Sequence, residues 1–272
     1  TWTAPDLRSD SSITKGPLLL NYCVTGRCEM ILNSKNFVYI KDRELSLTEC
    51  FAQKEYVYPR CIYEGLEFFI DIDTFTLENT WIQNEFSIDF RKISEMFCPH
   101  GSTYISTATH ETEEILKKLW GLYDFPASFA VIQMKIYTLA LFSILQNLKC
   151  IPPSQACTFF TESQVSIAKK VESIITSDLR QHHPAWELAE YFSISETSLK
   201  NYFRGVYGQN ISVYLREMRM NKAGELLAST RLSVAEIAAQ VGYLNQSKFA
   251  SVFKKHFGVS PLEYRRTRHL DS

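Results

Sequence analysis

The stretch that decides the fold of this chain is VAEIAAQVGYLNQSKFASVFKKHFGVSPLEYRR, at residues 234–266. Ser233 lies directly before it and Glu236 follows three residues later, a spacing that predicts a helix N-terminus closed by a capping box. Apolar residues at 234, 237, 238 and 241 share one face of that helix, and Gly242 ends it. A second helix from about residue 246 buries positions 249, 252 and 253 and ends at Gly258. The sequence therefore predicts two short helices joined by a tight turn.

The same pattern occurs a second time, about fifty residues upstream. Residues 188–192 repeat the apolar pattern of 237–241 at an offset of 49, whereas Phe203 and Gly208 match Phe253 and Gly258 at an offset of 50. The one extra residue is expected in the turn at 242–245, where an insertion costs least. The buried face of the first helix in this earlier copy is expected to contain Trp186, Leu188, Ala189 and Phe192.

The second helix of each copy carries a polar outer face suited to reading DNA. Asn and Gln can pair with adenine, Lys with guanine, and Ser or Thr with either base edge. The base-reading candidates are Thr197, Lys200 and Asn201 in the first copy and Gln246, Ser247, Lys248 and Ser251 in the second. The phosphate-binding candidates are Arg204, Lys254, Lys255, Arg265 and Arg266. The plainer alternative is a pair of solvated amphipathic helices in an all-α domain, but two copies in register favour DNA binding.

Residues 234–243 and 247–266 together resemble the signature of AraC/XylS-type transcription regulators. The helix expected at 212–228 is similar to that family's connecting helix, so the resemblance covers about 164–266. It implies a DNA-binding domain of seven helices, two recognition helices in the major groove and RNA polymerase as a partner. A connecting helix on the order of 25 Å long suits successive major grooves. Two residues depart from the pattern, because Ser193 stands where glycine is common and the acidic Glu196 opens the first recognition helix.

Composition and charge favour a cytoplasmic regulator over an enzyme or a membrane protein. The chain has 272 residues and a net charge of −1, yet residues 161–272 contain 15 Lys+Arg against 11 Asp+Glu. No nucleotide-binding loop or nucleophile motif occurs, so no enzymatic activity and no cofactor are expected. The most apolar stretch, residues 136–145, is shorter than the roughly 20 residues of a membrane span. Seven cysteines without a C-x-x-C pair read as reduced thiols.

Two pairs of possible metal ligands occur in the chain. Cys98 and His100 offer two ligands, and Cys150 and Cys157 offer another two. A structural zinc site needs four ligands, and buried thiols are common, so no metal is expected.

The chain is expected to form two domains, with the first at 1–149, a linker at 150–162 and the DNA-binding domain at 163–272. Pro152 and Pro153 break the helical pattern at that linker. Strands are predicted at 18–24, 28–32, 37–40, 44–47 and 66–71, with a hairpin at Thr25-Gly26, so the front should be a small barrel or sandwich. Helices at 110–123 and 127–148 follow. The second is more apolar than one side of a small sheet needs, so it either packs deeply or faces another subunit. The prediction is a homodimer formed mainly by the front domain.

This front arrangement is similar to the cupin-like sensor and dimerisation helices of many AraC/XylS-type regulators. The fold class is therefore α+β, with a cupin-like barrel and dimerisation helices before an all-α domain. Residues 18–73 contain no histidine, which argues against the usual cupin metal. A small organic effector is expected at Tyr22, Arg27, Glu29 and Tyr63, although a barrel filled by its own side chains is the alternative. The rival function is a non-DNA interaction bundle fused to a small-molecule carrier.

Overall fold

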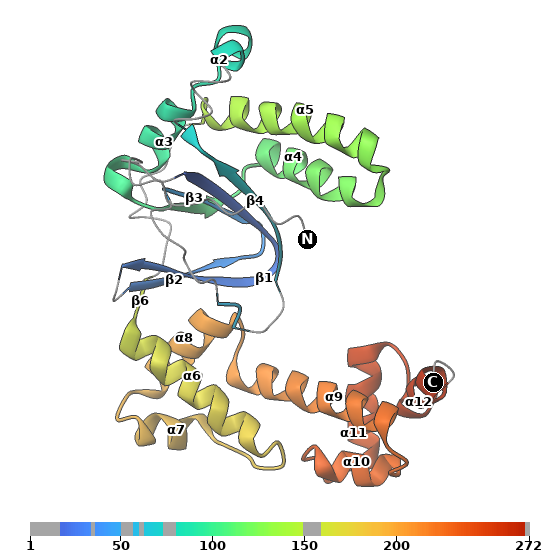
Figure 1. Cartoon of the computed structure of the whole chain (residues 1–272). Coiled ribbons are helices and arrows are strands. Elements are labelled where there is room, and N and C mark those ends of the chain that lie inside the picture. Colours follow the sequence, from blue (N-terminus) through green and yellow to red (C-terminus); the bar gives the residue numbers. More distant parts are fainter. Residues whose placement is uncertain are drawn as a thin grey trace. The chain divides into compact units, whose positions relative to one another are not determined.

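The computed structural model describes residues 17–33, 36–49, 57–59, 63–72, 80–148 and 159–269 (Figure 1). The chain divides into two compact units, Thr1–Phe159 and Phe160–Ser272. The division lies inside the segment 150–162 that the sequence assigns to a linker. Each unit is built around its own set of elements.

The first unit contains a curled antiparallel sheet, a half-barrel in outline (Figure 1). Its strands are β1 (Leu18–Asn33), β2 (Asn36–Lys41), β3 (Glu44–Glu49), β4 (Tyr63–Ile70) and β5 (Tyr104–Thr107). The early part of β1 pairs with both β3 and β4, and its later part pairs with β2. β5 pairs with β3 at the other edge. The long strand β1 thus pairs directly with β2, β3 and β4, and its bend curls the sheet.

The predicted hairpin at Thr25-Gly26 is wrong, because β1 runs through it as a single strand of 16 residues. The pairing of β1 with β4 shifts register between Cys23 and Thr25, and Gly26 has φ of 97°. The Gly26 N–H donates to Asp42 Oδ1 at 2.8 Å. A glycine with positive φ serves a bulge as well as a turn, so the local signal was the same for both structures.

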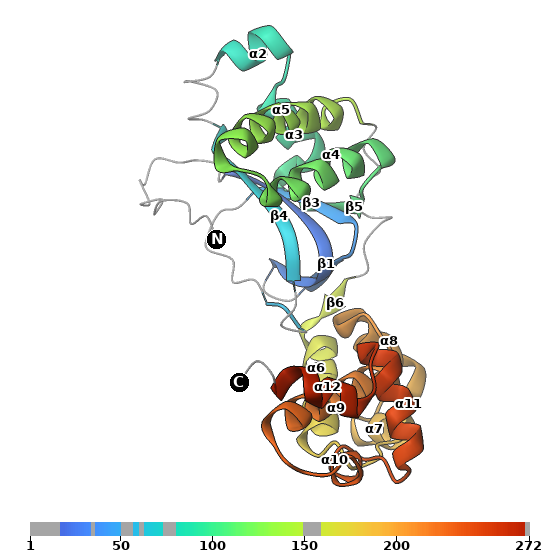
Figure 2. The ribbon, with the colours of Figure 1, turned by 90° about the vertical axis from the view of Figure 1, so that its right-hand side faces the viewer.

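Helices cover one face of this sheet (Figure 2). The helices over the sheet are α3 (Phe90–Phe97), α4 (His110–Gly121) and α5 (Ala127–Leu145), while α2 (Thr80–Phe86) lies beyond them. Two short 3₁₀ turns, η1 (Pro99–Gly101) and η2 (Leu122–Asp124), complete this part of the unit. α4 and α5 agree with the predicted helices at 110–123 and 127–148. Leu18, Leu20 and Tyr22 of β1 face this core, where Phe142 and Leu145 of α5 are fully buried.

The second unit is helical. After the short β6 (Phe160–Thr161), its elements are α6 (Glu162–Ser177), α7 (Ala185–Tyr191), α8 (Glu196–Tyr207), α9 (Ile211–Ser229), α10 (Val234–Gln240), α11 (Gln246–Phe257) and α12 (Pro261–His269). Within 159–269 there are thus seven helices, as the resemblance implied. The predicted connecting helix is α9, and the predicted capping box between Ser233 and Glu236 is present.

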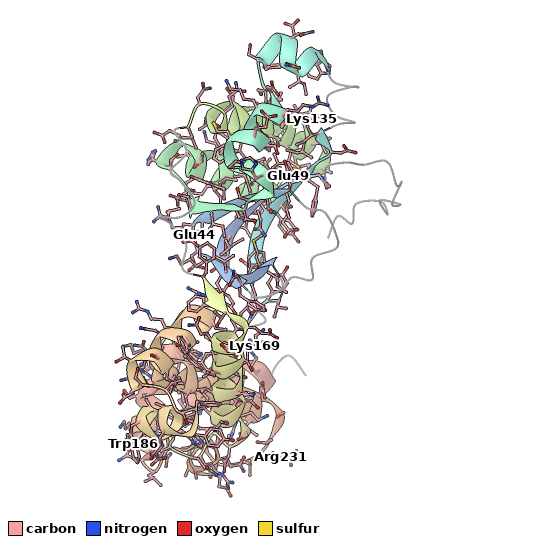
Figure 3. The ribbon with its side chains drawn as sticks, turned by 90° about the vertical axis from the view of Figure 1, so that its left-hand side faces the viewer. Glu44, Glu49, Lys135, Lys169, Trp186 and Arg231 are labelled. Atoms are coloured by element: carbon pink, nitrogen blue, oxygen red, sulfur yellow. The ribbon has the colours of Figure 1, made fainter. Side chains whose placement is uncertain are left out.

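Each helix pair packs as the repeat predicted, with one exception. Phe249, Phe253 and Ile237 are fully buried with the C-terminal half of α9, and Leu199 and Phe203 are fully buried in the first copy. Trp186 is not part of the buried face, because 57% of it is exposed and its side chain lies at the surface (Figure 3). Position 186 is the second residue of α7, where the helix has only begun and no neighbouring turn covers the ring.

Candidate nucleic-acid interface

The two second helices of the repeat, α8 and α11, are built in the same way. Ser195 Oγ accepts the N–H of Ser198 at 3.1 Å before α8, and Asn245 Oδ1 accepts the N–H of Lys248 at 2.9 Å before α11. Both helices end at a glycine in the left-handed region, Gly208 with φ of 79° and Gly258 with φ of 78°. Matching caps at both ends give the two helices equal length and equal presentation of their outer faces.

The one-residue insertion lies in the second turn, as predicted, and it is Leu244. The N–H of Ile194 donates to Ala189 O at 3.0 Å, and the N–H of Tyr243 donates to Ala238 O at 2.8 Å, so these two turn residues are equivalent. Ser195 follows Ile194 directly as the N-cap, whereas Leu244 intervenes before Asn245. Leu244 is fully exposed beside the start of α11. The second turn therefore carries an apolar side chain that the first turn lacks.

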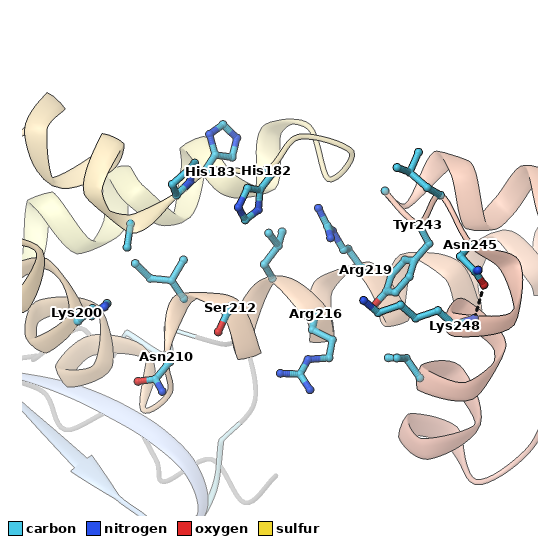
Figure 4. Close-up of a pocket in the computed structure, with 17 residues that line it drawn as sticks. His182, His183, Lys200, Asn210, Ser212, Arg216, Arg219, Tyr243, Asn245 and Lys248 are labelled. Atoms are coloured by element: carbon cyan, nitrogen blue, oxygen red, sulfur yellow. Dashed lines mark hydrogen bonds between the residues drawn. The ribbon is translucent and has the colours of Figure 1, made fainter.

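A groove of about 1050 Å³ lies between α8 and α11 (Figure 4). Lys200 of α8 and Lys248 of α11 line it from its two sides, and α9 contributes residues between them. The seven base-reading candidates are all exposed, namely Thr197, Lys200, Asn201, Gln246, Ser247, Lys248 and Ser251. One base-reading candidate from each recognition helix, Lys200 and Lys248, therefore lines the same groove. Their contact with bases stays a prediction.

Lys200 has an ion-pair partner on its own helix. Its ammonium group contacts the Glu196 carboxylate one turn earlier in α8. A base contact by Lys200 would have to replace this pair. The corresponding Lys248 of α11 has no acidic residue four positions before it, since Leu244 stands there. The second recognition helix is thus the better prepared of the two for contact with an anion.

The phosphate candidates divide into exposed and engaged side chains. Arg204, Lys254, Lys255 and Arg266 are exposed. Arg265 is only partly exposed, and its Nη2 donates to Leu232 O at 2.5 Å, which ties α12 to the segment before α10. A phosphate contact by Arg265 would compete with this bond.

Four basic residues that line the groove were not among the predicted contact residues, namely Arg216 and Arg219 of α9 and His182 and His183 before α7. Ser212, Leu215, Arg216 and Arg219 all line the groove, and their spacing of three, four and seven residues is that of one helix face. That periodicity was readable in the sequence. What was not readable is that this face of α9 lies toward the groove rather than toward the solvent on the other side.

The four residues predicted to bind an effector do not lie around one common pocket of the first unit. Tyr22 lies in the core under the helices and lines a pocket of about 360 Å³ with Arg43, Lys117 and Trp120. Tyr63 packs instead against the second apolar cluster of the sheet, which contains Cys23, Cys28, Met30, Val38, Ile40 and Ile105. Glu29 is buried and accepts the hydroxyl of Tyr39 at 2.6 Å. Burial of Arg27 lowers the pKa of its guanidinium, against the opposing effect of Glu44 and Asp42.

Tyr63 belongs to a polar cluster that the sequence did not reveal. Its hydroxyl donates to Asn21 Oδ1, and Asn21 Nδ2 donates to Glu67 Oε1 at 3.2 Å. Burial raises the pKa of both Glu67 and Tyr63 above their ordinary values. Alternation along β4 puts Tyr63, Gly65 and Glu67 on one face, which was the available signal.

Two ion pairs lie in the lining of the pocket that Tyr22 also lines. Arg43 Nη2 lies 2.5 Å from Glu113 Oε2, and Lys117 Nζ lies 2.8 Å from Glu113 Oε1. Hydrogen bonds from these two cations lower the pKa of Glu113 to about 2. Both cations are thus already paired with a carboxylate of the chain.

Among the described residues, no group of three or more His, Cys, Asp or Glu side chains could hold a metal ion. Cys98 is a buried free thiol, while Cys150 and Cys157 lie outside the described residues. Burial also raises the pKa of the Cys23 and Cys28 thiols to about 12, so both stay protonated at neutral pH.

Comparison with known proteins concerns chiefly the second unit. A family model described as a helix-turn-helix domain matches residues 188–267. The HTH-type transcriptional activator CsvR of Escherichia coli is 28% identical over 152 residues, 55% of this chain and 52% of CsvR. The transcriptional regulator SirC of Salmonella typhimurium is 33% identical over 104 residues, 38% of this chain and 35% of SirC. The matched segments thus span about half of the first relative and a third of the second.

A solved structure of a transcriptional regulator from Chromobacterium violaceum, titled as having an AraC-type DNA-binding domain, is 25% identical. It covers 39% of this chain and 95% of that chain, with a TM-score of 0.36. The names of the relatives are those of transcription regulators and not of enzymes. The unit Phe160–Ser272 therefore carries a helix-turn-helix domain of the AraC type, similar to the corresponding segments of these transcription regulators.

Proposed function

We propose that the chain is a sequence-specific transcription regulator that binds duplex DNA with α8 and α11 in adjacent major grooves. The observation that carries this proposal is the pair of equally capped helices with donor-rich faces on either side of one groove. Side chains able to pair with base edges stand on both helices. A helix pair used only for protein contacts would not need such a repeat.

The charge of the groove supports the same proposal. The groove offers the cations Lys200, Arg216 and Lys248 to a partner, while the guanidinium of Arg219, which also lines it, is bonded to two backbone carbonyls of the chain. No acidic residue is among its described lining residues. Arg216 is exposed and has no ion pair among the residues with described side chains. The chain as a whole has a net charge of −1, whereas the described lining of the groove contains cations and no carboxylate. Such a groove attracts the phosphate backbone and weakens in salt.

Selection of duplexes from a random library by the purified full chain tests the proposal. The expected result is an enriched motif of two half-sites about one helical turn apart, bound with a salt dependence that falls when Arg216 is replaced by alanine. Retention of duplexes without any enriched motif, or no retention at low salt, would favour the rival non-DNA module.

We further propose that the first unit forms a homodimer through α5. Phe129, Ile132 and Ile136 of α5 form an apolar stripe at helical spacing, and Ile132 and Ile136 are 59% and 52% exposed. The opposite side of α5 packs into the core through Leu141, Phe142 and Leu145. By length and composition alone, α5 is also long and apolar enough to span a membrane, with a mean hydropathy of 1.6. The apolar stretch expected at residues 136–145 is shorter than the apolar helix that the structure shows. Its packing on α4 and the core supports the dimer.

A small organic effector remains our proposal for the first unit. The cluster of Asn21, Tyr63 and Glu67 supports it, because it sets hydrogen-bonding groups beside an apolar cluster of the sheet. A thermal-shift screen of the full chain with apolar metabolites should raise the melting temperature, and Tyr63→Phe should reduce that shift. No shift with any compound would leave the cluster as part of a filled core. Contact with RNA polymerase stays a prediction from the family resemblance.

A further inference from the structure

Arg219, in the middle of α9, connects three separate parts of the helical unit. Its Nε donates to Leu179 O at 2.8 Å, and its Nη2 donates to Gln181 O at 3.0 Å. Its guanidinium also lies 5.9 Å from the ring centre of Tyr243, in the turn before α11 (Figure 4). One side chain thus holds the loop that leads into the first helix pair, the connecting helix and the turn of the second pair.

The loop and the turn also approach each other directly at Gly242. A Cβ atom at this position would lie 2.6 Å from Leu179 O, 3.0 Å from the Arg180 Cα and 3.0 Å from the Arg219 guanidinium carbon. The loop itself is held in shape by Asp178, whose carboxylate accepts Arg180 Nε at 2.9 Å and the Arg180 N–H at 3.0 Å. The backbone carbonyls of the loop are therefore presented to Arg219 by a local turn.

Little else joins the two helix pairs apart from α9. The core of the second pair contains Met220, Ala223 and Leu227 of α9 together with residues of α10, α11 and α12, and none from α6 to α8. The N-terminal half of α9 packs on the first pair instead, where the Tyr214 ring lies 5.4 Å from that of Phe203. Without a second connection, any bend of α9 would move one recognition helix relative to the other.

The geometry of DNA makes such movement costly. α9 has 19 residues, so about 14 Å of helix extends on either side of its middle, and a bend of ~10° there displaces a recognition helix by ~2.5 Å. One base pair of spacing corresponds to about 3.4 Å and about 35° of rotation. A bend of that size is thus comparable with a change of one base pair.

We propose that Arg219 is a positioning residue that fixes the distance between α8 and α11, and so makes the domain selective for the spacing of its two half-sites. This inference rests on the proposed function, since it concerns how the two helices read DNA together. Arg219 needs no contact with DNA for this role. Lysine cannot replace it, because an ammonium group lacks the planar fork that reaches two carbonyls and an aromatic ring at once.

The test uses the full chain and the duplex motif obtained by selection, with zero, one or two base pairs added between the half-sites. We expect the native chain to lose at least tenfold in affinity for one added base pair. Arg219→Ala and Arg219→Lys should reduce that penalty to threefold or less, while binding to a single half-site stays within about twofold of native. Arg216→Ala is the matched control, because it should weaken all duplexes alike and leave the spacing penalty unchanged.

Hydrogen exchange on the free chain provides a readout without DNA. Both Arg219 variants should speed exchange in peptides covering 178–184 and 240–246 and leave α6 and the C-terminal half of α9 unchanged. A full spacing penalty in both Arg219 variants would overturn the inference while leaving the proposed function intact. Unfolding of the helical unit in both would also overturn it, by making Arg219 a requirement of the fold. If the native chain binds no duplex, the proposed function fails. Unchanged hydrogen exchange in the Arg219 variants would then also reject the proposed positioning role of Arg219.

Discussion

Replacing Gly242 by alanine should destabilise the second helix pair. The loss in unfolding free energy should exceed the cost of placing an alanine in the left-handed backbone conformation of this position. Gly242 has φ of 82°, and the left-handed region costs a residue with a Cβ roughly 1–2 kcal/mol. Alanine also restricts the unfolded chain, which offsets about 0.4–1 kcal/mol. The new Cβ would lie 2.6 Å from Leu179 O, a backbone atom that moves only with the loop, so overpacking adds about 1–3 kcal/mol. The expected loss is ~1–5 kcal/mol.

Gly258 provides the matched control within the same helix pair. Its φ is 78°, nearly that of Gly242, yet a Cβ there would meet nothing within 4 Å. Gly258→Ala should therefore cost only the conformational part, about 1 kcal/mol. The difference between the two variants isolates the close approach of the turn to the loop at Leu179.

Hydrogen exchange of peptides from α10 and α11 measures the opening free energy of this helix pair separately from the first unit. Ser193 extends the comparison, since it occupies the equivalent turn position with φ of 54°, and Ser193→Gly should stabilise the first pair slightly. Equal losses for Gly242→Ala and Gly258→Ala would refute the reasoning, because the approach to Leu179 would then carry no weight.

Four further outcomes are expected from single changes. Gln246→Ala should weaken the selected duplex by about 1–3 kcal/mol and leave scrambled duplexes unaffected in a fluorescence binding titration. Lys255→Ala should weaken all duplexes alike and reduce the salt slope by roughly one unit. Ile132→Glu and Ile136→Glu should each shift the chain from dimer to monomer in sedimentation; a monomeric native chain, or one that floats with lipid vesicles, would contradict the dimer. The pKa of Glu113 is lowered to about 2, so its ion pairs stabilise the fold above pH 4.5 and are lost as pH falls toward 2. In urea unfolding at a series of pH values, Glu113→Gln should remove this part of the decrease in unfolding free energy with falling pH.

Sequence reasoning succeeded best where local signals agreed with one another. The capping box at Ser233 and the ends of α8 and α11 at Gly208 and Gly258 depend on residues within a few positions of each other. Such signals act through neighbouring backbone groups and so survive without knowledge of the rest of the fold. The failure at Thr25-Gly26 has the same origin, because a positive-φ glycine serves a bulge and a turn equally.

The sequence by itself determined the helical repeat, the connecting helix and the polar outer faces of α8 and α11, since these follow from periodicity and caps along a single element. Only the tertiary structure decided which face of α9 lines the groove, that Arg219 meets Leu179 and Gln181 forty residues away, and that Tyr22 and Tyr63 belong to different apolar clusters. These features depend on how separate elements pack, and a side chain's partners across such a distance are set by the packed arrangement rather than by local propensity. The specificity expected of the groove therefore depends on contacts that no local stretch of the chain encodes.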